Sequence, residues 1–256
     1  MAPVGRGPAA GVAVQFLLFA GVAVQFLLFA GVAVQFLLLA AIAATAGLSA
    51  GGWLAGTAYG LVLCGALAAR MRRAGMRAMG PANAVTFARA LLVGGVTAMV
   101  VSSFSRPVHL AGLVVLVGVA MALDGVDGQV ARRTNSTTKL GARFDMEVDA
   151  FLILVLSAYV AVHMGPWVLA IGLMRYVFVA ASWRFRWMNA PLPGSYARKV
   201  VAAVQGIFLV VAASGLLPFA AVLVGLALAS LVWSFGRDVL WLWRNAAVSV
   251  GGSRHV

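Results

Sequence analysis

The chain of 256 residues has a mean hydropathy of +1.02, and only 10% of its residues are charged. These values exclude an ordinary soluble domain. Apolar runs of about 20 residues, each long enough to cross a bilayer, recur along the chain and indicate an integral membrane protein. Because no period-two pattern of a membrane β-barrel appears, we predict an all-α fold.

The net charge of +13 and the isoelectric point near 11.6 do not indicate a nucleic-acid partner. The basic residues lie in short loops between apolar runs, and the cytoplasmic excess of Lys and Arg in membrane proteins explains this distribution. A single cysteine, Cys64, lies in an apolar run and supports neither a disulfide framework nor a thiol metal site.

A nearly perfect decapeptide repeat, AGVAVQFLL followed by Phe or Leu, fills residues 10–39. Its only polar side chains are Gln15, Gln25 and Gln35, and we expect no ligand role for them. The apolar run 9–47 is long for one span and short for two, and a second run covers 53–69. Residues 1–70 are therefore predicted to be a hydrophobic extension of one or two helices.

Six further spans are predicted from residue 83 onward, in a catalytic membrane domain over residues 71–240. Residues 241–256 are predicted to be a basic cytoplasmic tail. The helices are expected over 81–101, 109–124, 140–162, 167–183, 200–213 and 219–235. Basic loops alternate with loops that carry almost no charge, which puts the segment around Asp124 on the cytoplasmic side of the cell membrane.

Five of the six acidic residues of the chain lie between positions 124 and 149. At about 100° per helical residue, Asp124 and Asp127 share one helix face, and Asp145 and Asp149 share a face of the next helix. Glu147 points away from both of these neighbours and is not expected to bind metal. Charge this rare and clustered among apolar helices predicts a functional site.

The chemistry of four carboxylates without Cys or His partners favours Mg²⁺ or Mn²⁺. Two such ions, roughly 4 Å apart, clamp the attacking and leaving oxygens in phosphoryl transfer. The small residues beside the acids leave room for a diphosphate to approach the helix backbone. Arg132 is a cation that can bind this diphosphate. A buried salt-bridged cluster and a cation pathway remain alternatives.

The preceding helix begins at Pro81 and carries a polar stripe of Asn83, Thr86 and Arg89, spaced three residues apart. We expect this stripe to run from the membrane interface into the protein core.

The spacing of the acidic segment resembles the signature of the CDP-alcohol phosphotransferase family at eight positions. These are Asp124, Asp127, Gly128, Ala131, Arg132, Gly141, Asp145 and Asp149. The resemblance extends to Pro81 and the polar stripe, and to Lys199 and Gln205 on a later helix, and covers about residues 80–236. Ala202 departs from it, because a hydroxyl residue is expected there.

The resemblance implies that CMP is displaced from a CDP-linked lipid, with CDP-diacylglycerol as the expected donor, by an acceptor hydroxyl. It also implies that the four aspartates ligate two divalent cations, Mg²⁺ or Mn²⁺, with Asp127 bridging and Asp149 also acting as the general base. It assigns the CDP-lipid contacts to a larger set: Asn83, Thr86, Arg89, Gly128, Ala131, Arg132, Thr138 and Gly141. It further implies a homodimer.

Three cations are weaker candidates for binding the acceptor: Arg175, Arg198 and Lys199. Arg175 lies well inside an apolar helix, where an arginine usually faces a polar cavity, although pairing with a neighbouring helix would also explain it. Together the three favour a phosphorylated acceptor. We therefore expect a phospholipid-synthesis transferase. Its rivals are a divalent-cation transporter that uses the same carboxylates and a protein that keeps the fold without activity.

Overall fold

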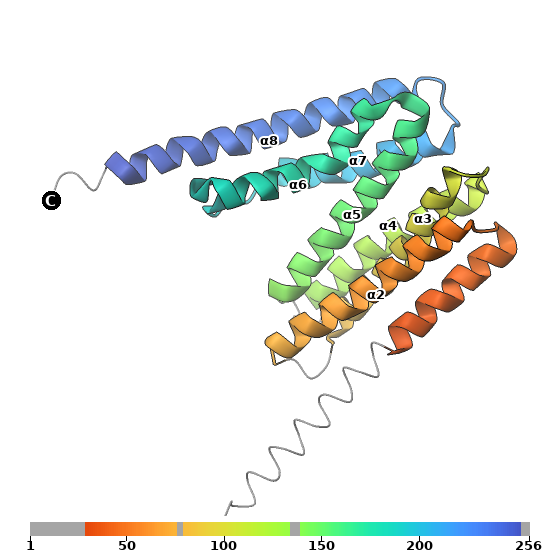
Figure 1. The fold of residues 1–256 in the computed structure, drawn as a ribbon. Coiled ribbons are helices and arrows are strands. Elements are labelled where there is room, and N and C mark those ends of the chain that lie inside the picture. Colours follow the sequence, from red (N-terminus) through yellow and green to blue (C-terminus); the bar gives the residue numbers. More distant parts are fainter. Residues whose placement is uncertain (1–28, 76–78, 134–138, 252–256) are drawn as a thin grey trace, which may run out of the picture. The chain divides into compact units, whose positions relative to one another are not determined.

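The computed structural model describes residues 29–75, 79–133 and 139–251, which are almost entirely helical (Figure 1). Within these residues there is no strand, and seven helices are long and apolar enough to cross a membrane. The prediction of an all-α integral membrane protein is therefore confirmed. Six of these helices follow residue 80, which matches the expected six-helix core, and one precedes them.

A shorter apolar helix, Phe29–Thr45, comes before the seven candidate spans. The longer helices and the two short 3-10 helices are, in chain order, α2 (Ala50–Arg73), α3 (Pro81–Ser103), α4 (Leu110–Arg133), α5 (Lys139–Met164), η1 (Pro166–Val168), α6 (Leu169–Arg184), η2 (Arg186–Asn189), α7 (Tyr196–Ser214) and α8 (Ala220–Gly251).

Two helix boundaries differ from the sequence-based expectation. Helix α7 begins at Tyr196, directly after the Pro- and Gly-containing loop, so Arg198 and Lys199 lie in its first turn. Helix α8 continues past residue 235 to Gly251. No proline interrupts this stretch, and its arginines, leucines and tryptophans sustain a helix. The repeats that contain Gln15 and Gln25 lie outside the described residues.

The chain forms two compact units, Met1–Asp145 and Met146–Val256, and the boundary between them falls inside α5. In the first unit, α3 packs against both α2 and α4. Pro81 suits the first turn of α3, where its missing N–H leaves no hydrogen bond unmade. Most side chains of α3 are buried, including Val93, Val96 and Ala98. This helix is therefore the centre of the first unit.

A glycine stripe on α2, formed by Gly52, Gly56 and Gly60, allows the neighbouring helices to approach closely. A Cβ on Gly52 would lie 2.6 Å from the backbone oxygen of Ala98 in α3, and one on Gly56 would lie 3.0 Å from the Ala98 Cβ. Small residues four apart let helix backbones touch within a membrane, where apolar burial gives helices little reason to associate. Ser49 supports the contact, because its backbone N–H donates to the Ser102 hydroxyl at 3.0 Å.

Gln35, from the third repeat, is buried between this stripe and α3. Its exposed fraction is 2%, and a Cβ on Gly60 or Gly94 would meet its side chain at 2.7 or 2.6 Å. Within the described part of the chain, neither amide atom of Gln35 has a hydrogen-bond partner. The repeat therefore contributes to helix packing here.

In the second unit, α7 packs along α8 after a tight turn at Gly215, whose φ of +64° suits glycine. Gly172 of α6 lies directly against α5, since a Cβ there would be 2.6 Å from the Leu154 Cα. The rings of Phe178 and Phe235 meet edge to face with centroids 5.4 Å apart and join α6 to α8. Gly172 thus lets α6 approach α5 closely within this unit.

We predict that Gly52→Ala destabilises the protein by about 1–3 kcal/mol, because the added methyl group must push apart two backbones. Thermal unfolding in detergent measures this change. Gly65→Ala on the same helix is the matched control, since nothing lies within 4 Å of its Cβ position. Equal melting temperatures for the two variants would contradict the packing role of the stripe.

Candidate active site

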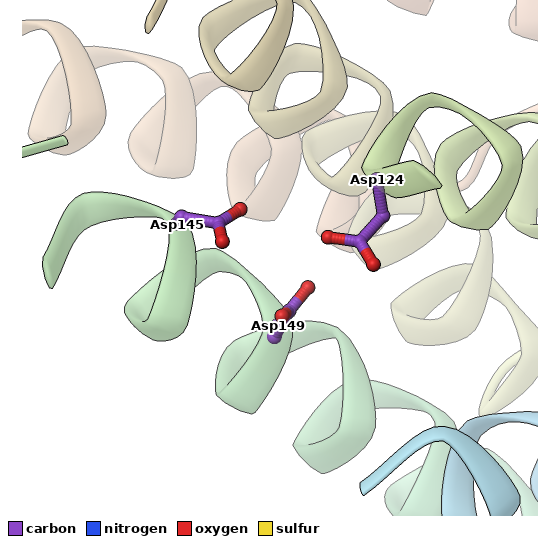
Figure 2. Close-up of side chains that lie close together, drawn as sticks. All are labelled: Asp124, Asp145 and Asp149. Carbon is purple, nitrogen blue, oxygen red and sulfur yellow. The ribbon is translucent and has the colours of Figure 1, made fainter. Parts of the chain in front are cut away.

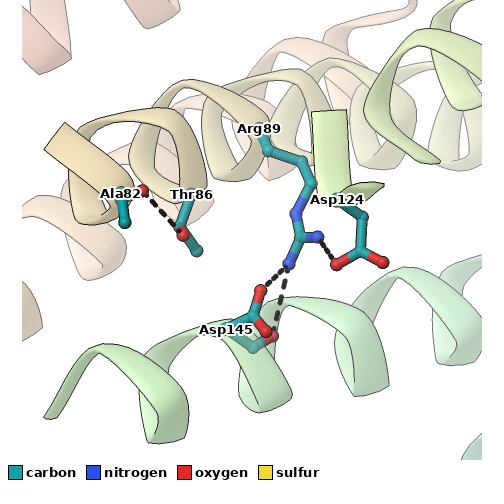
Figure 3. Close-up of polar contacts among 5 residues, drawn as sticks. All are labelled: Ala82, Thr86, Arg89, Asp124 and Asp145. Carbon is teal, nitrogen blue, oxygen red and sulfur yellow. Dashed lines mark hydrogen bonds and ion pairs between the residues drawn. The ribbon is translucent and has the colours of Figure 1, made fainter. Parts of the chain in front are cut away.

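The polar stripe of α3 is buried, as the sequence analysis expects. Asn83, Thr86 and Arg89 have exposed fractions of 8%, 4% and 1%. The Thr86 hydroxyl donates to the Ala82 carbonyl at 3.2 Å, which satisfies it within its own helix (Figure 3). The stripe therefore leads from the start of α3 to a buried guanidinium.

Arg89 reaches two aspartates from two different helices. Its Nη1 donates to Asp124 Oδ1 of α4, and its Nη2 donates to Asp145 Oδ1 of α5 (Figure 3). The same Nη2 lies 3.4 Å from the Asp145 carbonyl oxygen, which also accepts from it. An arginine fork fits two carboxylates at once and remains charged when buried. Arg89 thereby ties three helices together at the acidic segment.

Asp149 lies one turn after Asp145 on the continuous helix α5, so the two share a face. Carboxylate oxygens of Asp124, Asp145 and Asp149 lie within 4.8 Å of one another. Figure 2 shows the three side chains pointing toward a common space. Three of the four predicted metal ligands thus come together. The side chain of the fourth, Asp127, lies outside the described set, although its backbone belongs to α4.

The three carboxylates fit a hard divalent cation. Mg²⁺ binds oxygen at about 2.1 Å, so two ligands of one ion lie about 3–4 Å apart. Oxygens within 4.8 Å of each other need only a small adjustment to share an ion, and their spacing also suits a pair of bridged ions. Side chains of Asp124 and Asp145 are 47% and 37% exposed, so a solvated ion can reach them.

Other residues of the predicted CDP-lipid site are only partly described. Gly128 lies on α4 one turn after Asp124, and Gly141 is buried one turn before Asp145 on α5. Side chains of Ala131 and Arg132 lie outside the described set, and so does the whole of Thr138.

Glu147 points away from the aspartates, as its helical angle predicts, and pairs with Arg175 of α6. Its Oε1 accepts from Arg175 Nη2 at 2.7 Å. This is the pairing with a neighbouring helix that was the alternative explanation for Arg175. The guanidinium is 27% exposed.

A second group of charges lies where α7 begins beside α8. Arg198 Nη1 donates to Asp238 Oδ2 at 3.1 Å, and Arg237 Nη2 donates to the other oxygen at 3.3 Å. Arg198 also donates to the Pro193 carbonyl. Of the three cations considered for the acceptor, Lys199 is exposed.

The family model described as CDP-alcohol phosphatidyltransferase matches residues 79–233, more than half of the chain. This range begins just before α3 and includes the whole acidic segment. The chain belongs to the CDP-alcohol phosphatidyltransferase family. The resemblance in the acidic segment is thereby confirmed.

Human ethanolaminephosphotransferase 1 is 39% identical to this chain over 74 residues. The match covers 25% of this chain and 19% of the human protein, so the chain spans only about a fifth of that relative. No solved structure matches the chain.

Two features of this structure are not predicted from the sequence. Arg89 is expected there among the CDP contacts, and its pairing with Asp124 and Asp145 is not foreseen. No partner is predicted for Asp238, the one acid outside the acidic segment. A charged residue within an apolar span indicates that a partner of opposite charge exists, but the sequence does not show which residue that partner is.

We predict that Mn²⁺, at a concentration well above its Kd, raises the melting temperature of the detergent-solubilised protein by about 5 °C or more. The reason is that a ligand that binds only the folded state stabilises that state. Asp149→Asn should abolish most of this rise, because it removes a ligand. Asp238→Asn, which changes an acid outside the cluster, should keep it. A rise that persists in Asp149→Asn would show that Mn²⁺ binds elsewhere.

Proposed function

We propose that the protein transfers a substituted phosphate from a CDP-linked alcohol to an acceptor hydroxyl and releases CMP, using Mg²⁺ or Mn²⁺. The observation that carries this proposal is the convergence of Asp124, Asp145 and Asp149 in a chain that has only six acidic residues. Family membership supplies the CDP-alcohol substrate class.

The reaction forms one P–O bond and breaks another. The acceptor oxygen bonds to the phosphorus that carries the donor alcohol, and the bond from this phosphorus to the oxygen of CMP breaks. Asp149 takes the proton of the acceptor hydroxyl, a role worth about 10²–10⁴-fold in rate. Asp124, Asp127, Asp145 and Asp149 would hold two divalent ions. When bound, these ions offset the negative charge that develops on the departing CMP.

The CDP group lies against α3 and α4 in this proposal. Gly128 and Ala131 leave space for it beside the α4 backbone, Arg132 and Thr138 bind its diphosphate, and Gly141 permits its approach to α5. Asn83 and Thr86 close over it, which is supported by their burial on the same helix as Arg89.

The donor is proposed to be CDP-diacylglycerol, with the acceptor a small or lipid alcohol. The human relative favours a second candidate, because its name states that phosphoethanolamine is the group it transfers. In that case the donor is a CDP-linked head group and the acceptor is a lipid alcohol. The chemistry at the aspartates is the same in both cases.

The acidic segment is proposed to lie on the cytoplasmic side of the cell membrane, since the basic loops flank it. A homodimer is also proposed from the family. Neither proposal changes the chemistry above.

The decisive assay for this function is CMP release by the purified protein in nanodiscs. We expect release that requires Mg²⁺ or Mn²⁺ with either CDP-diacylglycerol and a panel of alcohols, or CDP-ethanolamine and diacylglycerol. Asp149→Asn should lower the rate by at least about 10²-fold, because it removes both a ligand and the base. Asp238→Asn should retain metal-dependent release.

The alternatives predict different results in the same preparation. A cation transporter predicts ion flux across sealed vesicles without nucleotide, and an inactive member of the fold predicts metal-dependent CDP binding without turnover. Absence of CMP release with every donor and acceptor would contradict the proposed function.

We propose three cations as contacts of the acceptor: Arg175, Arg198 and Lys199. The ion pair of Arg175 with Glu147 allows this proposal to be tested for Arg175. A guanidinium has five N–H donors and the contact to Glu147 is made by Nη2, so other N–H groups of Arg175 are left for a phosphorylated acceptor. We then predict that Arg175→Gln raises the acceptor KM about tenfold, whereas Glu147→Gln leaves it unchanged or lowers it. Equal effects of both changes on KM would instead identify the pair as a link between α5 and α6.

A further inference from the structure

The position of Arg89 gives it a role that differs from a CDP contact. Its guanidinium lies between Asp124 and Asp145 and pairs with both of them (Figure 3). We infer that Arg89 is a positioning residue that acts as the internal cation of the metal-free site. It holds Asp124 and Asp145 together until a divalent ion takes at least one of them. This inference rests on the proposed metal-dependent function.

The burial of Arg89 explains why it must be paired. The side chain is 1% exposed, whereas the two aspartates are 47% and 37% exposed. A buried charge without a partner is strongly destabilising. The partly exposed aspartates can be solvated by water or by an ion, but Arg89 has little access to solvent. Arg89 therefore needs the ion pairs to remain stable in its buried position, whereas the aspartates could be solvated without them.

Arg89 also stabilises the acidic cluster, because its positive charge offsets repulsion among the carboxylates. Asp124, Asp145 and Asp149 place three carboxylates within 4.8 Å, and repulsion among them would spread them apart. A guanidinium that forks onto two of them reduces this repulsion and fixes their positions. The metal-free protein thus keeps its ligands in a binding arrangement without any ion.

The same contacts imply competition. Arg89 donates to Oδ1 of each aspartate, so a divalent ion shares these two carboxylates with the guanidinium and is repelled by its positive charge. Ion binding therefore weakens at least one arm of the fork. Affinity for the ion is then set partly by the arginine, and the site binds a divalent ion more weakly than its acids alone would.

The test measures Mn²⁺ binding by electron paramagnetic resonance on full-length protein in detergent, without nucleotide. We predict that Arg89→Gln lowers the melting temperature of the metal-free protein and tightens Mn²⁺ binding at least about tenfold, because a positive charge beside the ion has been removed. The Mn²⁺-induced rise in melting temperature should be larger than in the wild type. Unchanged or weaker Mn²⁺ binding by Arg89→Gln would overturn the inference.

Two further variants keep the test decisive. Arg89→Lys retains the charge but not the fork, so it should fold even if Arg89→Gln does not, and its Mn²⁺ affinity should exceed that of the wild type by less than in Arg89→Gln. Arg89→Lys with wild-type or weaker affinity would contradict the inference. Arg198→Gln, which breaks an ion pair with an acid outside the cluster, should leave Mn²⁺ affinity unchanged. An equal gain in Arg198→Gln would attribute the effect to net charge and also overturn the inference.

Failure of the proposed function gives a different result. If the wild-type protein shows no saturable Mn²⁺ binding, the metal site itself is absent, and the role of Arg89 is excluded with it. If the wild type binds Mn²⁺ and Arg89→Gln does not bind it more tightly, the metal site stands and only the inference fails.

Discussion

A buried arginine shared by two aspartates is the interaction on which the candidate site depends. Arg89 comes from α3, the most buried helix of the first unit, and its partners come from α4 and α5. An apolar helix bundle has few polar groups that could substitute for a lost partner, so the ion pairs fix how these three helix segments meet. The acidic cluster is therefore built around a positive charge that the chain supplies itself.

Close helix packing supplies the rigidity that such a site requires. Gly52 brings the backbone of α2 against α3, the helix that carries Arg89, and Gly172 brings α6 against α5, the helix that carries Asp145 and Asp149. Metal ligands must be held within a fraction of an ångström, and ligands on well-packed helices meet this condition better than ligands on loops. The glycines far from the acids thus contribute to the chemistry through the position of the helices.

Local periodicity predicted much of this structure from the sequence. The helical angle placed Asp145 and Asp149 on one face and turned Glu147 away, and apolar run length gave the six later helices. Pairing between distant segments could not be predicted in this way. Arg89 and Asp145 are 56 residues apart, and Arg198 and Asp238 are 40 apart, so each pair depends on which helices become neighbours. The end of α8 was also missed, because its arginines suggested a tail although they are compatible with a helix.

Anomalous diffraction of Mn²⁺ in crystals of the full chain tests directly whether the aspartates form a metal site. We predict a peak about 2.1–2.2 Å from carboxylate oxygens of Asp124, Asp145 or Asp149, with Arg89 turned away from at least one partner. Mn²⁺ found only at other positions, or no Mn²⁺ peak at a concentration that supports CMP release, would contradict it.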